Sequence, residues 1–278
     1  MTILVTGGKG TTAKPLAELL KKNNIPFLVA SRSSSGQGQV RFDWSDESTY
    51  ELPFQAATEP ITAIYMVAPK VPDVFGTMKA FIDFARGKGV KRFVLLSATP
   101  VPIGGPMYGK VHEYLTQIGV EYGVVRPTWF MNNLTMDVYN KEIIEKGQIS
   151  SGAKNGKLPW VSAEDIAAVA YRLLTDEKPH NTDYTVRGPE LLTYDQVAEI
   201  ISKEIGKPVK HNSVSDEELY QRFIEIGTGE EEGQILVMLE GQIAQGSEEQ
   251  MDENVLKVTG RPPKSFATFA AENRHNWL

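Results

Sequence analysis

The sequence contains no cysteine. This absence excludes disulfide bonds, thiolate metal sites and a cysteine nucleophile, and it is typical of proteins that work in a reducing compartment. Histidines are present, but they lie far apart and lack the spacing of metal ligands: His112, His180, His211 and His275. We therefore predict that the chain holds no metal.

The sequence also lacks long apolar runs and an excess of basic residues. No run approaches the roughly 20 residues that a membrane-spanning helix needs. The chain passes from the apolar residues 2–5 directly to Gly7, unlike a signal peptide. The 29 Lys and Arg residues are outnumbered by 35 Asp and Glu, giving a net charge of −6. This balance disfavours nucleic acid or an anionic membrane as a partner, and we expect a cytoplasmic protein.

What the sequence does contain is a regular alternation of apolar strands and helices. With 278 residues it is long enough for one large domain, or for a domain and a smaller lobe. Strands are predicted at 2–5, 25–32, 40–44, 61–68, 91–99 and 121–130, with helices between several of them. This pattern is typical of a parallel sheet covered on both faces, a Rossmann-like doubly wound α/β fold.

A glycine-rich turn between the first strand and the first helix is the first chemical signal. Gly7, Gly10 and Ala13 have the spacing G-x-x-G-x-x-A. Such glycines let the backbone approach a pyrophosphate, which the helix N-terminus can receive. The turn predicts a dinucleotide site, although a tight turn that binds nothing is the alternative. We assign to this site Thr6, Gly7, Gly8, Gly10, Thr11 and Thr12.

The end of the second strand indicates which dinucleotide is bound. NAD enzymes usually place Asp or Glu here to hold the ribose 2′-hydroxyl, whereas this chain has Ser31, Arg32, Ser33 and Ser34. A guanidinium and hydroxyls suit a 2′-phosphate, so the predicted cofactor is NADP(H). A solvated Arg32 is the alternative. Asp43, after the third strand, could lie beside the adenine or simply hold a turn.

The chain is predicted to have two parts. We expect residues 1–130 to form the NADP-binding core and residues 131–278 to form a smaller, substrate-binding α/β lobe interleaved with it. In the second part, helices are predicted at 162–174 and 193–205, and a short strand at 183–188. Ligands of such folds bind at the carboxyl edge of the strands.

Six ordered blocks carry a resemblance to a known family. They are TILVTGGKGTTA with PFLVASRSS, KAFIDFARGKGVKRFVLLSAT, GVVRPTWFMNN, GKLPWVSAEDIAAVA, HNTDYTVRGPELLTYDQVA and VTGRPP. Together they resemble the NmrA-like atypical short-chain dehydrogenases, and more narrowly the fungal festuclavine and agroclavine dehydrogenases of ergot alkaloid biosynthesis. The resemblance implies an NADPH-dependent reductase of an imine or iminium intermediate of an indole alkaloid.

One motif of the wider superfamily is missing. Short-chain dehydrogenases place a lysine four residues after a tyrosine, so that the phenol can protonate an alkoxide. Here Tyr108 is followed four residues later by His112, and the nearby lysine is Lys110. Hydride addition to an iminium cation gives a neutral amine and needs no acid, so the absence fits an iminium substrate. We assign no catalytic residue; the candidates are Tyr108, Lys110 and His112.

Residues at the ends of the later strands are candidates for the rest of the site. Val67, Ala68, Ser97 and Lys110 are predicted to contact the cofactor. The substrate pocket is predicted to be apolar and aromatic, because its main task is to position the substrate. Its candidates are Met66, Pro69, Thr99, Tyr108, Trp129, Phe130, Asn133 and Trp160. The alternatives are a solvated Lys110, a His112 packed on its helix, and aromatic residues that belong to the core.

Three functions remain open at this point. The first is the reductase just described. The second is a redox-coupled, NADP(H)-dependent Diels–Alderase, a cyclase that acts on an azadiene of a prenylated indole alkaloid. The third is a non-catalytic, NADP-sensing regulator of the NmrA type. Aromatic residues at the strand ends favour an enzyme, but reduction and cyclisation need the same cofactor and the same kind of pocket.

Overall fold

The computed structural model describes residues 1–8, 10–33, 36 and 38–278. By their internal contacts the residues divide into two compact units. Unit 1 comprises Met1–Pro127, Ala163–Val186 and Lys257–Gly260. Unit 2 comprises Thr128–Ser162, Arg187–Leu256 and Arg261–Leu278. Each unit is therefore built from segments that are far apart in the sequence.

Unit 1 is built on a seven-stranded parallel sheet with the order β3-β2-β1-β4-β5-β6-β8. Its strands are β1 (Thr2–Val5), β2 (Phe27–Ser31), β3 (Gln39–Arg41), β4 (Ile61–Met66), β5 (Arg92–Leu96), β6 (Glu121–Pro127) and β8 (Thr182–Val186). The order reverses between β1 and β4, the switch point at which sheets of this kind bind ligands. The predicted Rossmann-like, doubly wound fold is confirmed.

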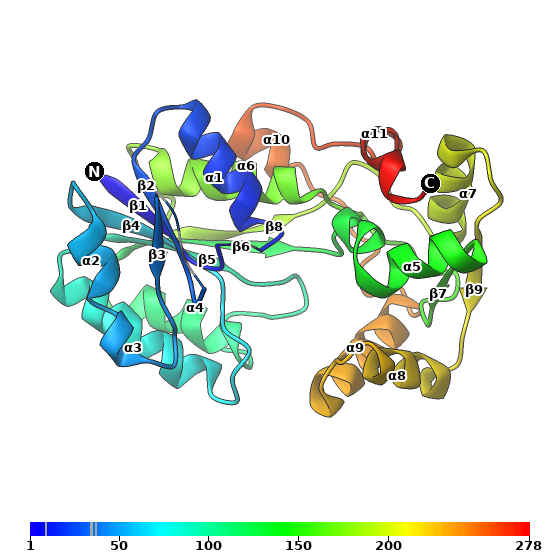
Figure 1. The fold of residues 1–278 in the computed structure, drawn as a ribbon, viewed down its shortest axis with the longest axis horizontal. Helices are drawn as coiled ribbons and strands as arrows, with labels where there is room; N and C mark the ends of the chain where they lie inside the picture. The colour runs from blue at the N-terminus through cyan, green and yellow to red at the C-terminus, as the bar shows by residue number, and fades with distance from the viewer. Residues whose placement is uncertain (9, 34–35, 37) are drawn as a thin grey trace. The chain divides into compact units, whose positions relative to one another are not determined.

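Helices cover both faces of this sheet (Figure 1). One face carries α1 (Ala13–Lys22) and α6 (Ala163–Thr175), which contact each other. The other face carries α2 (Leu52–Ala56), α3 (Val74–Gly87) and α4 (Tyr108–Gln117), and a short 3-10 helix, η1 (Glu47–Thr49), precedes α2. Helix α6 and strand β8 come from the second half of the sequence and nevertheless complete unit 1.

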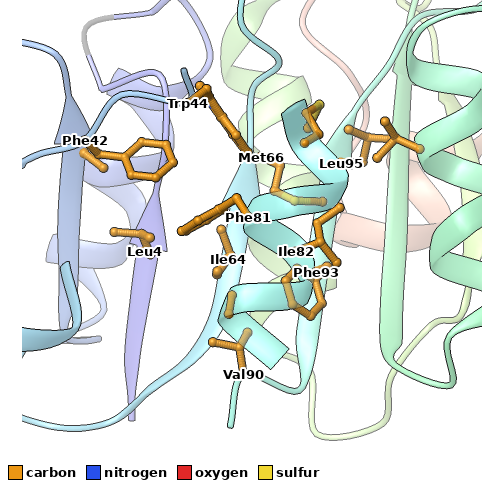
Figure 2. Close-up of a cluster of buried hydrophobic side chains, with 14 of the residues drawn as sticks. Leu4, Phe42, Trp44, Ile64, Met66, Phe81, Ile82, Val90, Phe93 and Leu95 are labelled. Atoms are coloured by element: carbon orange, nitrogen blue, oxygen red, sulfur yellow. The ribbon is translucent and has the colours of Figure 1, made fainter. Parts of the chain in front are cut away.

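The core of unit 1 lies between the sheet and α3. Figure 2 shows the ring of Phe81 directed toward Phe42 and Leu4. The ring centroid of Phe81 is 4.6 Å from that of Phe42, 5.3 Å from that of Trp44 and 5.0 Å from that of Tyr50. Burial of one such side chain contributes about 1.5–3 kcal/mol, so this aromatic cluster is a major source of the stability of unit 1.

Unit 2 has a small two-stranded parallel sheet, in which β7 (Gln148–Ser151) pairs with β9 (Lys210–Ser213). Its helices are η2 (Met131–Thr135), α5 (Asp137–Lys146), α7 (Tyr194–Ile205), α8 (Asp216–Glu225), α9 (Glu230–Ile243), α11 (Phe266–Asn273) and η3 (Arg274–Asn276). Helix α10 (Asn254–Thr259) begins in unit 2 and ends in unit 1. Near the C-terminus, Trp277 is buried and its Nε1–H donates to the Leu134 carbonyl oxygen at 2.7 Å.

Local sequence chemistry explains where the helices of unit 2 begin and end. Helices α7 and α8 each start with a capping box, formed by Thr193 with Gln196 and by Ser215 with Glu218. Helix α7 ends at Gly206, whose φ of +67° is readily adopted by glycine. Across the described residues of both units, no helix has the length and apolar character required to cross a membrane.

Candidate functional site

The glycine-rich turn lies at the carboxyl edge of the sheet in unit 1, between β1 and α1. Gly7 has a φ of +70°, in the left-handed region that favours glycine. A Cβ atom on Gly7 would lie 2.8 Å from Val67 Cβ, and one on Gly8 would lie 2.3 Å from Val29 Cγ1. The turn is therefore confined between β2 and the end of β4, with no room for a side chain at either position.

Gly10 has a structural role besides the predicted one. Its N–H donates to the Gly7 carbonyl oxygen at 2.6 Å, and a Cβ atom on Gly10 would lie 2.9 Å from that same oxygen. The sequence pattern indicated only that Gly10 leaves space for a pyrophosphate. Because the tight turn itself requires glycine, a side chain at this position would distort the turn as well as obstruct an anion.

The N-terminus of α1 follows this turn and is suited to receive an anion. Thr12 is the N-cap residue, but among the described residues its side chain accepts no hydrogen bond from the first helical turn. The third helical residue is Pro15, which has no N–H to offer to a cap. The first turn also contains no acidic residue. The positive end of the helix dipole is thus available for a diphosphate.

A buried hydrogen-bond network joins the ends of β1 and β4 beneath the turn. The Thr6 N–H and hydroxyl both donate to the Tyr65 carbonyl oxygen at 3.0 Å. The Val67 N–H donates to the Thr6 hydroxyl oxygen at 2.9 Å, and the Tyr65 hydroxyl donates to Thr12 Oγ1 at 2.9 Å. These bonds fix the position of the turn relative to the centre of the sheet.

The end of β2 is exposed where a 2′-phosphate was predicted to bind. Ser31 is the last residue of the strand, and Arg32 and Ser33 follow with exposed side chains. Ser34 lies outside the described residues. Asp43 is engaged in a turn: its carboxylate accepts from the Ser45 N–H at 2.9 Å. The geometry of Asp43 therefore matches the alternative in which it holds the chain locally.

At the end of β4 the structure corrects one predicted pocket residue. Met66 was expected to line the substrate pocket, but it is the last residue of β4, and its fully buried side chain belongs to the apolar core (Figure 2). Val67, Ala68 and Pro69 do follow the strand and are partly exposed. These three residues lie beside the glycine turn, because Val67 touches Gly7.

The end of β5 is held by an arginine that the sequence analysis did not single out. Arg126 of β6 donates to the carbonyl oxygens of Ala98 at 3.4 Å and Thr99 at 2.7 Å, and it pairs with Asp183 at 2.8 Å. Ser97 is nearly buried, and its N–H donates to the Val125 carbonyl oxygen. The arginine within an otherwise apolar strand was the available signal.

The three candidates on α4 lie in different surroundings. Tyr108, the first residue of the helix, is partly buried against the core, whereas Lys110 is exposed. Residues two positions apart lie on different sides of a helix, so Lys110 does not share a face with Tyr108. His112 is buried, with its ring centroid 6.1 Å from that of Tyr122. This arrangement is the alternative in which His112 packs on its helix.

The electrostatic state of His112 agrees with this packing role. Burial lowers the pKa of the His112 imidazole below its usual range; Asp183 opposes this effect and Arg126 reinforces it. The ring is therefore neutral at pH 7. At this pH the ring lacks the imidazolium proton that a general acid would give up.

In unit 2, the predicted pocket residues divide into buried and partly exposed ones. Trp160 is fully buried and meets Tyr194 and Phe266 edge-on, with centroid separations of 5.0 and 6.1 Å. It is a core residue, as the alternative stated. Trp129, Phe130 and Asn133 each keep part of their surface exposed. Trp129 also packs against the core of unit 2.

Unit 2 contains a buried carboxyl group that the sequence analysis missed. Glu240 of α9 is 1% exposed. One carboxylate oxygen accepts from the Gly152 N–H at 2.5 Å and the other from the Tyr139 hydroxyl at 3.2 Å. Burial raises the pKa of Glu240 to about 7, although these two donors and Arg222 lower it. Glu240 can therefore exchange a proton near neutral pH.

A serine, a histidine and an aspartate also line up in unit 2. Ser151 Oγ lies 2.8 Å from His211 Nε2, and His211 Nδ1 lies 3.3 Å from a carboxylate oxygen of Asp195. The order of groups is that of a serine hydrolase. However, Ser151 is 0% exposed and its oxygen also accepts from the Ala153 N–H. The chain of bonds therefore ties β7 to β9 and does not present a nucleophile.

Among the described residues, no group of three or more His, Asp or Glu side chains is placed to bind a metal ion. A parallel sheet in the order found here, with a glycine-rich turn at its switch point, defines a Rossmann-like α/β protein. The chain belongs to the NmrA-like family, whose sequence pattern it matches over residues 1–259. The resemblance inferred from the six blocks is confirmed.

Relatives and solved structures agree with this family. The chain is 42% identical to the agroclavine dehydrogenase of Claviceps fusiformis over 286 residues, with 100% of this chain and 99% of the relative covered. It is also 42% identical over 286 residues to festuclavine synthase II of Penicillium roqueforti (strain FM164), with both chains fully covered. The triphenylmethane reductase of Citrobacter sp., complexed with NADP(H), has a TM-score of 0.80 at 20% identity, with 98% of this chain and 99% of that chain covered.

Proposed function

We propose that the protein is an NADPH-dependent oxidoreductase that reduces an imine or iminium intermediate in indole alkaloid biosynthesis. The observation that carries this proposal is the full-length, 42% identity to proteins named agroclavine dehydrogenase and festuclavine synthase. Identity of this extent over the whole chain includes the edge of the sheet where ligands of this fold bind. A small-molecule alkaloid intermediate is accordingly the proposed substrate.

Unit 1 offers a place for the parts of NADP(H). The glycine turn and the N-terminus of α1 suit the diphosphate, since Gly7 and Gly8 leave the backbone bare and Thr12 caps no helical N–H. Arg32, with Ser31 and Ser33, suits the 2′-phosphate because its guanidinium is exposed at the end of β2. The bound reduced cofactor would supply a hydride. Val67, Ala68 and Ser97 are proposed to contact its nicotinamide half.

The arrangement of the three candidates on α4 supports an iminium substrate. Tyr108 and Lys110 lie on different sides of α4, and the buried His112 is neutral at pH 7. A carbonyl substrate would require a group that protonates the alkoxide. An iminium substrate requires only that the chain orient it and exclude water.

Substrate contacts are proposed for the second part of the sequence, residues 131–278, together with the segment just before it. Trp129 and Phe130 each keep part of an aromatic surface exposed, and such surfaces can stack on an indole. Asn133 adds a polar group that could orient the ligand. Trp160 is not included, because it is part of the core of unit 2.

The reaction is tested with NADPH deuterated at the transferable position. The purified protein is incubated with candidate indole iminium substrates, and the product is analysed by mass spectrometry and NMR. We expect one deuterium at the former iminium carbon. A cycloadduct, with or without deuterium, would support the cyclase instead, and tight NADPH binding with no turnover of any candidate would favour a sensor.

The Tyr108→Phe variant distinguishes an iminium substrate from a carbonyl substrate. Loss of the phenol should leave activity within about tenfold, whereas removal of a true general acid costs about 10²–10⁴-fold. The measurement is kcat under saturating NADPH, with NADPH affinity measured in parallel. A thousandfold loss at normal affinity would assign the phenol as a proton donor and overturn this part of the proposal.

Cofactor preference is tested with Arg32→Ala. The wild type should bind NADPH more tightly than NADH, and the variant should lose most of that preference, roughly ten- to a hundredfold for a charge-assisted contact. Arg86→Ala, at an exposed arginine on α3, is the matched control and should keep the preference. Equal affinity of the wild type for NADPH and NADH would contradict the assignment.

A further inference from the structure

Tyr65 is a buried phenol near the end of a mostly apolar strand. It lies on β4, at the centre of the sheet, and its side chain is fully buried. A buried hydroxyl requires a hydrogen-bond partner. The partner of Tyr65 is Thr12 Oγ1, at 2.9 Å, and these two residues are separated by 53 positions in the sequence.

Thr12 occupies an N-cap position but does not perform the usual capping role, because the Lys14 N–H at the second helical position donates to the Gly10 carbonyl oxygen instead. An N-cap hydroxyl normally accepts a hydrogen bond from the second or third residue of the helix. In α1 the third residue is Pro15, which has no N–H, and the Thr12 side chain makes no capping bond among the described residues. The oxygen of Thr12 is instead the acceptor of the Tyr65 hydroxyl.

Of the two hydroxyl protons of Tyr65 and Thr12, only one is donated within the pair. Burial raises the pKa of the Tyr65 phenol well above its usual range, against a smaller lowering by Thr12, so the phenol stays protonated. Each hydroxyl carries a single proton, and the Tyr65 proton is donated to Thr12. Among the described residues, the structure provides no acceptor for the Thr12 proton. A buried donor without an acceptor is unfavourable until an acceptor arrives.

The surroundings of Thr12 identify the kind of acceptor. The residue begins α1, where the positive end of the helix dipole favours an anion. Gly7 and Gly8 leave the adjacent backbone without side chains. The backbone of Tyr65 is itself fixed, because its carbonyl oxygen accepts both the N–H and the hydroxyl of Thr6. The orientation of Thr12 is thereby set from the centre of the sheet.

We infer that Tyr65 is a positioning residue for the cofactor diphosphate: its phenol holds Thr12 so that the Thr12 hydroxyl donates to a phosphate oxygen. The inference rests on the proposed function, in that it takes the anion to be the diphosphate of NADP(H). It assigns to a buried core tyrosine a role in binding that it exerts only through Thr12.

The test measures NADPH affinity of the full-length protein by isothermal titration calorimetry. Thr12→Val keeps the shape of the side chain but removes the hydroxyl, and should weaken binding about tenfold or more. Thr12→Ser restores a hydroxyl and should stay within about threefold of the wild type. Tyr65→Phe removes only the phenol oxygen and should weaken binding by roughly three- to tenfold. The double variant should bind no more weakly than Thr12→Val alone, because both changes act through one hydroxyl.

A second ligand separates this role from a general effect on the fold. Adenosine 2′-monophosphate contains the adenine, the ribose and the 2′-phosphate but no diphosphate. All four variants should bind it as the wild type does. Equal losses for both ligands, failure of Thr12→Ser to restore NADPH affinity, or additive effects in the double variant would each overturn the inference. Absence of NADPH binding by the wild type would instead overturn the proposed function.

Discussion

The two units bury different kinds of side chain. Beside the apolar core on its seven-stranded sheet, unit 1 buries an arginine, a histidine and an aspartate among the described residues, whereas three glutamates, Glu142, Glu240 and Glu248, are buried in unit 2. A broad parallel sheet satisfies its own backbone and offers two large apolar faces. The two-stranded sheet of unit 2 offers less such surface, and polar side chains connect its elements in addition to an apolar core.

The surroundings of Glu142 show how these connections work. Its carboxylate accepts from the Ser150 N–H at 3.0 Å, the Ser150 hydroxyl at 2.7 Å and the Gln148 amide at 2.7 Å. Arg222 of α8 adds a charged contact at 2.6 Å and also donates to the Ser150 carbonyl oxygen. One buried carboxylate thereby joins α5, β7 and α8. Unit 2 therefore combines its apolar core with a buried carboxylate that several of its elements share.

The largest expected effect comes from the core of unit 1. Phe81→Ala leaves a cavity at the centre of the aromatic cluster and should lower the free energy of unfolding by about 3–5 kcal/mol. The measurement is urea unfolding combined with hydrogen exchange mass spectrometry, which reports the two units separately. The half-buried Phe75 on the same helix is the control, and Phe75→Ala should cost less than half as much. Equal loss of protection from hydrogen exchange in both units would contradict the view that Phe81 stabilises unit 1 in particular.

The next effect concerns the buried ion pair between Arg222 and Glu142 in unit 2. Arg222→Met leaves Glu142 buried without its cation and should lower the free energy of unfolding by roughly 2–4 kcal/mol. Faster hydrogen exchange should be confined to α5, β7 and α8. The control is Lys203→Met, which breaks an exposed pair with Glu199 and should cost under about 0.5 kcal/mol.

A double variant sharpens this second prediction. Adding Glu142→Gln to Arg222→Met removes the unpaired buried charge, so part of the lost stability should return. If Arg222→Met alone costs no more than Lys203→Met, unit 2 does not depend on this pair, and the contrast between the units fails at its main example.

The smallest stability effect is a pH dependence that belongs to Glu240. Its pKa is about 7 in the folded protein and 4.5 for an unperturbed glutamate, so the folded state binds one more proton than the unfolded state between these pH values. The stabilising contribution is fully present below pH 4.5 and is lost as the pH rises through 7. Its size is on the order of 3 kcal/mol.

Glu240→Gln mimics the neutral acid and should remove this dependence. A glutamine can accept from the Gly152 N–H while its amide donates to the Tyr139 oxygen. We expect unfolding curves of the variant to change less between pH 4.5 and 7 than those of the wild type, and the variant to be the more stable of the two above pH 7. Glu230→Gln, at an exposed position on the same helix, should behave as the wild type. If the stability of Glu240→Gln depended on pH in the same way as that of the wild type, the pH dependence would not come from Glu240.

The candidate site was predictable from the sequence where its signals are local. The glycine turn, the start of α1 and the exposed arginine after β2 follow from residues that are neighbours in the chain. Steric limits on φ and the direction of a helix dipole act over a few residues, so spacing alone reveals them. Whether Met66 and Trp160 belong to the core or to the pocket was harder to predict, because that choice depends on how distant parts of the chain pack.

The sequence by itself determined the alternation of strands and helices, the parallel sheet and the turn at its switch point, since these depend on hydrophobic periodicity and on backbone sterics. Only the tertiary structure decided which distant side chains meet. Tyr65 and Thr12 are 53 positions apart, and Arg222 and Glu142 are 80 apart. No local pattern marks such pairs, because each partner is chosen by the register of the sheet and the packing of its helices. The physical reason is that a hydrogen bond or ion pair needs only proximity in space, and folding brings together residues that the sequence keeps apart.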